Sequence, residues 1–257
     1  LDYFKKKDYK KVLSLDGGGV RGLASVIFLK QLEKETGKTV FELFDFFIGV
    51  SAGGLNALHF TINKTSAEKL EDFWTKDNLA MSMQKSFWGQ AIFLNSKPKY
   101  NNESRTALLK NYFENKLIAH SDKPVSVLAY DVEKRKPRLI SSYDNSNISV
   151  ISAINATSAA PLYYPIVKIE DGSWLIDGGV VANNPSLIGY NEARKHFKTS
   201  NIKVFSVGTG LNLKRLDGKS SAEWGPIGWL RNDILGILAE TQYDHETLSD
   251  LLKEDYL

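Results

Sequence analysis

The strongest constraint on the fold is a regular alternation of short apolar runs and amphipathic segments, joined by loops of a few residues. Residues 11–15 form an apolar run that stops at Asp16, and residues 23–35 follow with the apolar spacing of a helix. Residues 45–50 and 52–62 repeat this order of strand and helix. The alternation predicts an α/β protein whose mostly parallel central sheet is covered by helices on both faces.

The rest of the chain continues in the same way. Asp171-Gly172 predicts a hairpin turn, whereas Asn184 and Pro185 predict the cap and the first position of a helix. We expect further strands over 125–130, 138–142, 166–169, 174–176 and 202–207, and helices over 148–156 and 185–197.

No repeat, low-complexity tract or linker interrupts the chain, so we expect one domain over residues 1–257. Residues 66–100 would form a helical insertion and residues 211–257 a helical extension. No signal peptide is recognisable. The chain begins at Leu1 rather than Met and ends in a helix-like stretch, which is compatible with a fragment of a longer protein.

Composition excludes several kinds of chemistry. The 257 residues contain no cysteine, which excludes disulfides, cysteine-ligated zinc, iron–sulfur clusters and thiol nucleophiles. The 33 Lys and Arg nearly balance the 30 Asp and Glu, and a net charge of +3 is too small a bias to predict a nucleic-acid partner.

No transmembrane segment is predicted. The most apolar window, residues 44–60, contains Asp45, His59 and three glycines and is shorter than the ~20 residues that a spanning helix needs. We therefore expect a soluble protein, cytoplasmic or secreted, that meets membranes only peripherally. The lysine cluster over residues 5–11 is interpreted as a solvated surface, with a weak contact to anionic lipid as the alternative.

The first loop with chemical potential is rich in glycine and lies between a strand and a helix. Gly17, Gly19 and Gly22 match the dinucleotide-binding pattern G-x-G-x-x-G. The second strand lacks the acidic residue that would hold a ribose, and no Lys follows Gly22, so neither a Rossmann site nor a P-loop is favoured. A row of backbone N–H groups remains, which is suited to binding negative charge.

The second loop supplies a candidate nucleophile. Gly49-Val50-Ser51-Ala52-Gly53 is a G-x-S-x-G motif at a strand-to-helix joint, the pattern of a nucleophile elbow. Because parallel strands end at the same edge of a sheet, an oxyanion formed at Ser51 would face the amides of Gly18 and Gly19. The alternative is structural: a small serine that lets a helix pack closely, beside a simple tight turn.

Such a serine needs a base, and the histidines offer none with a suitable neighbourhood. His59 is eight residues along the elbow helix, about 12 Å from the serine at 1.5 Å per residue. His120 follows a helix end, His196 lies in the last turn of its helix, and His245 is flanked by acidic residues.

The third loop offers a carboxylate instead. Asp177 follows an apolar strand and precedes Gly178 and Gly179, which allow another backbone to approach closely. An ordinary aspartate, with a pKa near 3.9, is a weak base, so it would have to act through desolvation and positioning. Taken alone, this loop favours the alternative of a polar turn.

In combination, the three loops resemble the patatin-like phospholipases, and segments 156–161 and 181–185 fit the same pattern. The resemblance covers about residues 11–210. It implies a three-layer α/β fold and lipid acyl hydrolysis by a Ser51–Asp177 dyad, without histidine, metal or cofactor. On this basis we expect an oxyanion hole and a supporting set of motif residues: Gly17, Gly18, Gly19 and Ala52 for the hole, and Arg21, Gly22, Gly49, Gly53, Gly178 and Gly179 in support.

The expected substrate is a phospholipid or lysophospholipid, with Arg21 orienting the loop or meeting lipid phosphate. An activator protein or ligand is compatible with the sequence but not visible in it. A non-catalytic lipid- or nucleotide-binding module on the same fold is the alternative. An apolar cluster within residues 73–93 would line an acyl channel, contact a bilayer or form ordinary core; its members are Phe73, Trp74, Met81, Met83, Phe87, Trp88, Ile92 and Phe93.

Overall fold

The fold is built around one sheet of seven strands. The computed structural model describes residues 9–85, 98–144, 147–210, 215–225, 228, 236–237 and 247–251. Within them the strands lie in the order β5-β6-β3-β2-β1-β7, and β4 pairs with β3. Their bounds are β1 Lys10–Leu15, β2 Phe46–Val50, β3 Val125–Asp131, β4 Lys136–Ser141, β5 Val167–Lys168, β6 Trp174–Asp177 and β7 Ile202–Val207.

The sheet has two buried faces, as the apolar runs of its strands predict. β7, β1, β2 and β3 are mutually parallel. Side chains alternate between faces along a strand, so Val12, Phe46 and Ile48 belong to one apolar cluster, whereas Leu13 and Phe47 belong to another. Both clusters are fully shielded from solvent at these positions. The predicted three-layer α/β class is therefore confirmed.

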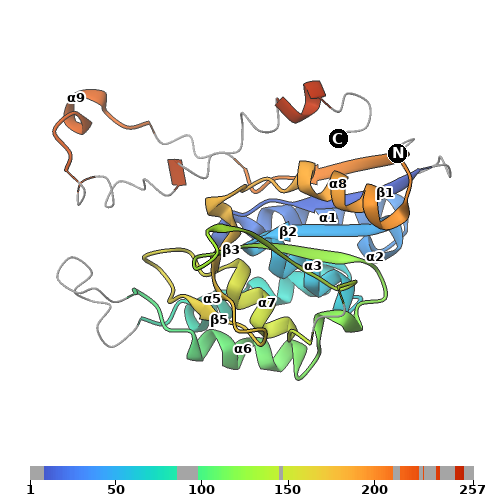
Figure 1. Cartoon of the computed structure of the whole chain (residues 1–257), viewed down its shortest axis with the longest axis horizontal. Coiled ribbons are helices and arrows are strands. Elements are labelled where there is room, and N and C mark those ends of the chain that lie inside the picture. Colours follow the sequence, from blue (N-terminus) through green and yellow to red (C-terminus); the bar gives the residue numbers. More distant parts are fainter. Residues whose placement is uncertain are drawn as a thin grey trace.

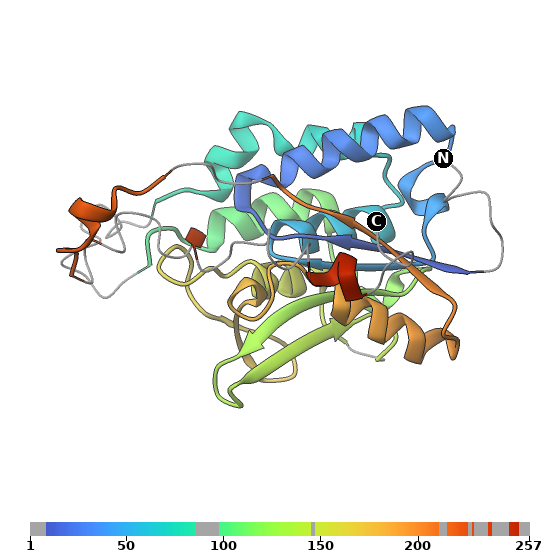
Figure 2. The ribbon, with the colours of Figure 1, turned by 90° about the horizontal axis from the view of Figure 1, so that it is seen from above.

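Helices cover both faces. α8 packs on β1, β2 and β7 from one side, and α3 and α7 pack on the sheet from the other, with α1 against α3 (Figure 1). Figure 2 shows α1 and α8 on opposite sides of the strands. The described helices are α1 Gly22–Thr36, α2 Val40–Leu43, α3 Ala52–Ile62, α4 Ala67–Glu71, α5 Lys76–Ser82, α6 Glu103–Phe113, α7 Val150–Thr157, α8 Ser186–Phe197 and α9 Gly218–Ser221. None of them is long and apolar enough to cross a membrane.

One feature of the sheet determines where the site lies. β3 extends beyond β2: Val50 lies opposite Leu128, and the next residue of β3, Ala129, lies opposite Asp177. β4 occupies the other edge of β3 over the same residues, so β2 and β6 share one edge. β2 is parallel to β3 and β6 is antiparallel to it. The two strands therefore run toward each other, and their carboxyl ends meet.

Several predicted boundaries differ by a few residues. α8 begins at Ser186 with Pro185 as its cap, not as its first helical residue. The side chain of Asn184 accepts the Ser186 N–H at 2.9 Å and sets this start. α7 begins at Val150 rather than Ile148 because the hydroxyl of Ser149 caps it.

Two helices were absent from the sequence-based expectation. α2 follows a capping box in which Thr39 and Glu42 exchange hydrogen bonds, a pattern that the sequence does contain. α6 begins after Asn102. The hairpin at Asp171-Gly172 is present, but its first strand, β5, has only two residues.

The expected insertion over 66–100 is only partly described. α4, a short 3₁₀ turn at Asp72–Trp74 and α5 occupy residues 67–82, and a β-bridge pairs Lys85 with Tyr100. Phe73 and Trp74 are buried in the main core. Four residues of the predicted apolar cluster, Phe87, Trp88, Ile92 and Phe93, lie outside the described residues. So do most of the predicted extension over 211–257 and His245 within it.

Candidate active site

Ser51 occupies a strained turn between β2 and α3. Its φ of 54° and ψ of −123° are unfavourable for a residue with a side chain. The side-chain oxygen of Thr157 accepts the Ser51 N–H at 3.0 Å and so holds the turn from the end of α7. A Cβ on Gly53 would lie 2.2 Å from the carbonyl oxygen of Leu15, and only glycine permits this approach. Strain and close packing together are the geometry of a nucleophile elbow.

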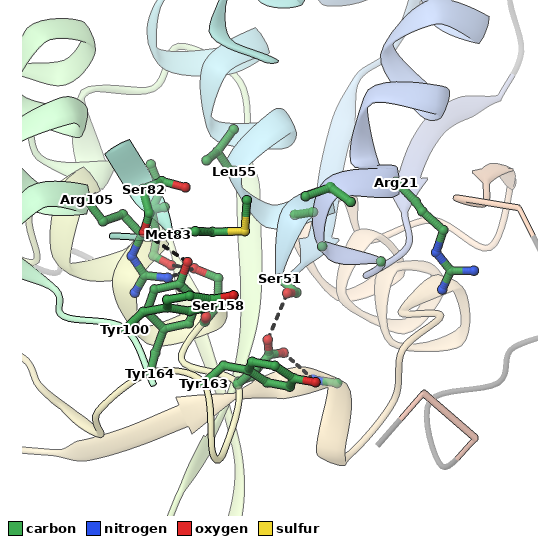
Figure 3. A pocket seen from close by; sticks show the side chains of 18 of the residues that line it. Arg21, Ser51, Leu55, Ser82, Met83, Tyr100, Arg105, Ser158, Tyr163 and Tyr164 are labelled. Atoms are coloured by element: carbon green, nitrogen blue, oxygen red, sulfur yellow. Dashed lines mark hydrogen bonds between the residues drawn. The ribbon is translucent and has the colours of Figure 1, made fainter. Parts of the chain in front are cut away.

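Asp177 lies directly against this serine. The Ser51 hydroxyl donates to Oδ2 of Asp177 at 2.8 Å, and the Gly179 N–H donates to Oδ1 at 2.8 Å (Figure 3). The close packing of Gly178 on β3, where a Cβ would lie 2.3 Å from the carbonyl oxygen of Leu128, fixes the turn that presents the carboxylate. The structure thus brings together two loops that are far apart in the sequence.

The environment of Asp177 makes it a stronger base than an exposed aspartate. Its side chain is almost completely buried, and this burial raises the pKa of Asp177 from 3.8 to about 6. Hydrogen bonds from Gly179 and Ser51 and the positive charge of Arg105 oppose the rise. A carboxylate with this pKa is ionised at neutral pH and better matched to accept a hydroxyl proton.

The glycine-rich loop lies at the carboxyl end of β1, beside the elbow. The Gly17 N–H donates to the carbonyl oxygen of Asn183 at 3.0 Å, and the Gly17 carbonyl accepts the Thr209 hydroxyl at 2.8 Å. The Gly17 amide is thus engaged within the protein, so the oxyanion donors proposed below are Gly18, Gly19 and Ala52. Gly18 and Gly19 line the cavity described below, whereas Gly17 does not.

The remaining candidate donors are uncommitted. Outside their own helices, the amides of Gly18, Gly19 and Ala52 make no hydrogen bond to another described residue. Gly18 is packed tightly, since a Cβ there would lie 2.1 Å from the Thr209 hydroxyl, and Gly19 adopts a positive φ of 55°. Ala52 is the first residue of α3, so its amide points toward the helix amino terminus.

Two further motif glycines make close contacts between elements. A Cβ on Gly22 would lie 2.8 Å from that of Ala52, and a Cβ on Gly49 would lie 2.3 Å from the carbonyl oxygen of Gly53. Arg21 is exposed, and its guanidinium donates to the carbonyl oxygen of Gly210 at 3.3 Å. Arg21 therefore connects the glycine-rich loop to the turn after β7.

A cavity of about 860 Å³ opens over the Ser51–Asp177 pair. One part of its wall is apolar, from α3, α5, α7 and the turn before α5; its members are Leu55, Phe73, Trp74, Leu79, Met83 and Ile154. Another part combines Arg105 with the tyrosines at positions 100, 163 and 164. Figure 3 shows Arg105 and Arg21 on opposite sides of Ser51. The charged residues among those that line the cavity are Arg21, Arg105 and Asp177.

None of the histidines within the described ranges lines this cavity. His59 is buried among Phe73, Tyr112 and Phe113, and burial lowers its pKa to about 3. Nδ1 of His120 accepts the backbone N–H of Leu117. His196 is exposed at the end of α8. His245 lies outside the described residues.

Sequence reasoning did not single out two residues that organise the site. Thr157 holds the elbow, and its hydroxyl donates to the Leu128 carbonyl of β3. Thr157 lies within segment 156–161, which fits the patatin-like pattern, and this is the one feature of the sequence that pointed to it. Arg105 is a single arginine on a helix that was not predicted, so no sequence pattern pointed to it.

A serine on a strand-to-helix elbow, bonded to a buried carboxylate beside a glycine-rich loop in a three-layer α/β fold, defines a class of hydrolase-like proteins. The model of the family described as "Patatin-like phospholipase" matches residues 13–188. Patatin-like protein 4 of Arabidopsis thaliana is 31% identical over 284 residues, covering 91% of this chain and 69% of that protein. The chain belongs to the patatin-like phospholipase family, which places it among the lipid hydrolases.

Other relatives are more distant. A protein named cGAMP-activated phospholipase from Vibrio cholerae is 29% identical, covering 98% of this chain and 79% of that protein. Patatin-like protein 2 of Arabidopsis thaliana is 29% identical, and the match spans 65% of its length. The crystal structure of VipD from Legionella pneumophila matches with a TM-score of 0.48 and 13% identity, covering 84% of this chain and 52% of that one.

Proposed function

We propose that this protein is a serine acyl hydrolase that cleaves a fatty-acyl ester of a phospholipid or lysophospholipid through an acyl-enzyme on Ser51. The observation that supports this most strongly is the 2.8 Å hydrogen bond from the Ser51 hydroxyl to a buried carboxylate whose pKa is raised to about 6. A nucleophile and its base within hydrogen-bond reach are the signature of covalent catalysis. Asp177 takes the place that a histidine holds in many serine hydrolases.

The acylation step follows from this geometry. Oγ of Ser51 attacks the ester carbonyl carbon while its proton passes to Oδ2 of Asp177. The carbonyl oxygen becomes an oxyanion that the amides of Gly18, Gly19 and Ala52 stabilise; removing one such donor typically costs about 2.7–4 kcal/mol. When the tetrahedral intermediate collapses, the bond to the glycerol oxygen breaks, and that oxygen takes the proton from Asp177.

Deacylation uses the same groups. A water molecule gives a proton to the carboxylate of Asp177 and attacks the acyl carbon, forming a second oxyanion in the same place. Collapse breaks the bond to Oγ of Ser51, which regains a proton from Asp177, and the fatty acid leaves. The protein is thereby restored, and Asp177 has carried the proton in both half-reactions.

The cavity supports a lipid substrate. Its apolar wall lies beside Ser51 and is suited to an acyl chain, since burial of a methylene group contributes about 0.8 kcal/mol. Phe73 and Trp74 line this cavity, which supports the acyl-channel interpretation of the apolar cluster over residues 73–93. Both residues also belong to the main core.

We place the peripheral membrane contact at the rim of this cavity. Val20 and Val180 line the cavity and yet are 50% and 49% exposed. Leu162, between two lining residues, is 47% exposed and has a φ of 73°, which is unfavourable for a bulky side chain. Exposed apolar side chains around the entrance would insert into the interfacial region of a bilayer and place lipid at the opening.

A non-catalytic lipid binder is the remaining alternative, and an activator is compatible with a relative named for activation by cGAMP. The test is a lipid panel analysed by mass spectrometry, together with labelling by a fluorophosphonate. We expect labelling at Ser51 and release of fatty acid, both lost in Ser51→Ala. Saturable lipid binding without labelling or release, with and without cyclic dinucleotide, would support the alternative and contradict the proposal.

A further inference from the structure

Arg105 is a buried cation in the wall of the catalytic cavity. It lies on α6 and is only 6% exposed, and it lines the same cavity as Ser51 and Asp177. Its guanidinium stacks over the ring of Tyr164 at 4.0 Å. A buried charge is costly unless an opposite charge or several hydrogen bonds compensate it.

Neutral groups hold this guanidinium in place. One terminal nitrogen donates to the carbonyl and hydroxyl oxygens of Ser158 at 3.1 and 3.2 Å. The other donates to the Asn102 side chain at 3.0 Å and to the carbonyl oxygen of Asn155 at 3.3 Å. The carbonyls at the end of α7 contribute a partial negative charge. These contacts fix the orientation of Arg105 but do not neutralise it.

Arg105 has no carboxylate partner in the described structure. Among the described residues, no Asp or Glu oxygen lies within 4.0 Å of its nitrogens, and its Nε, which is buried, has no hydrogen-bond acceptor. The anionic group that shares the cavity is Asp177, which becomes neutral whenever it holds the serine proton. During the proposed acylation, Arg105 would therefore face no ionised carboxylate among the described residues that line the cavity.

A substrate anion that pairs with Arg105 would come from a part of the substrate away from the ester. The oxyanion forms on the carbon attacked by Ser51, where the glycine-rich loop and Ala52 supply donors. Figure 3 shows Arg105 set apart from Ser51, with Ser158 between them, so the released carboxylate would also form away from it. In a glycerophospholipid the phosphate is the anion that lies a few bonds from the acyl ester, and a planar guanidinium is well suited to it.

We propose that Arg105 is the residue that selects phosphate-bearing lipids over neutral acylglycerols. This inference rests on the proposed acyl hydrolase function and specifies its substrate class. Tyr164 and Ser158 act as positioning residues that hold the guanidinium. Arg21 lies on the opposite side of Ser51 (Figure 3), where it donates to the carbonyl oxygen of Gly210.

The first test compares two substrates that differ only in the phosphocholine headgroup: 1-palmitoyl-lysophosphatidylcholine and 1-monopalmitoylglycerol, in the same mixed micelles. The measured quantity is the ratio of their kcat/KM values. We expect the ratio to favour the phospholipid, to fall at least tenfold in Arg105→Gln and to fall less in Arg105→Lys, which keeps the charge. Arg138→Gln is the matched control, because Arg138 pairs with Asp171 at the surface and does not line the cavity.

An unchanged ratio in Arg105→Gln would overturn the proposal. If kcat/KM falls equally on both substrates, the role of Arg105 is purely structural. A second measurement does not depend on the folding of that variant or on catalysis. The Ser51→Ala protein is titrated with ether-linked lysophosphatidylcholine and with the matched monoalkylglycerol. At least tenfold tighter binding of the phospholipid analogue is expected, and equal affinities refute the role of Arg105. If the wild-type protein hydrolyses neither substrate, the result contradicts the proposed hydrolase function, and the binding titration still tests the role of Arg105.

Discussion

The Oγ of Ser51 and the Oδ2 of Asp177 lie 2.8 Å apart although 126 positions separate the two residues in the chain. The reason is the extension of β3 beyond β2, which lets β6 pair with its last residues so that β2 and β6 end against each other. Ser51 directly follows the last residue of β2, and Asp177 is the last residue of β6. The proposed nucleophile and base are therefore positioned by strand pairing, which is more rigid than a contact between two free loops.

The backbone strain at Ser51 predicts a trade-off between activity and stability. Ser51→Gly and Ser51→Ala should both lower kcat/KM by at least about 10³-fold, because both remove the nucleophile. The positive φ strains any residue with a Cβ by about 1–3 kcal/mol, and only glycine relieves this strain. Glycine in turn loses about 0.5–1 kcal/mol of conformational entropy on folding. Ser51→Gly should thus unfold a few degrees above Ser51→Ala in a calorimetric scan. Equal melting temperatures would show that the turn is unstrained.

The raised pKa of Asp177 predicts the pH dependence of activity. The base must be ionised to accept the serine proton, so kcat/KM should rise with pH through about 6 and level off above it. An exposed aspartate would place this limb near pH 4. A pH–rate profile of the wild-type protein on a soluble ester measures it. Asp177→Asn should remove activity, and a profile limb that persists in that variant would assign the titration to another group.

The same shift predicts a stability change of defined sign. A carboxyl whose pKa is higher in the folded state than in the unfolded state binds a proton more tightly when folded, so its contribution to stability is lost as pH rises from about 4 to about 6. The difference in unfolding free energy between Asp177→Asn and wild type should therefore grow in favour of the variant across this interval. Urea unfolding at pH 4, 5, 6 and 7 tests this, and a constant difference contradicts it.

The packing of the elbow predicts a severe effect from one methyl group. In Gly53→Ala the new Cβ would lie 2.2 Å from the Leu15 carbonyl and 2.6 Å from the Asp16 carbonyl, and both are backbone atoms that cannot move without distorting β1. Loss of several kcal/mol or failure to fold is expected. Gly218→Ala is the control, since a Cβ there meets nothing within 4 Å. Comparable unfolding midpoints for the two variants would refute the close approach.

The exposed rim predicts which residues mediate membrane contact. Val20→Ser, Leu162→Ser and Val180→Ser, combined in the inactive Ser51→Ala background, should weaken sedimentation with phospholipid vesicles about 100-fold, at roughly 1 kcal/mol for each of the three exposed side chains that inserts. Ile27→Ser is the matched control.

Ile27 is 51% exposed on α1 and does not line the cavity, so this substitution changes apolar surface without touching the rim. If it weakens vesicle binding as much as the combined rim variant does, binding is a general effect of apolar surface and the rim has no special role.

The sequence was sufficient where the determining physics is local. Periodic apolar runs in β1, α1, β2 and α3 identified the alternating elements, because each period reports which side of an element is buried. The elbow glycines Gly49 and Gly53 marked positions where a side chain would collide with the backbone. These local signals were enough to predict the three-layer class and to single out Ser51.

Only the tertiary structure decided which groups work together. Taken alone, the loop at Asp177 favours a polar turn, and only the family resemblance assigned it to a dyad. The pairing of β6 with the end of β3 brings Asp177 to Ser51, and burial raises its pKa. The same applies to Gly17, whose amide is engaged by the distant Asn183, and to Arg105, which no local pattern marks. Burial, long-range hydrogen bonds and the balance of charge in a cavity depend on residues that are remote in the chain, so no local pattern in the sequence determines them.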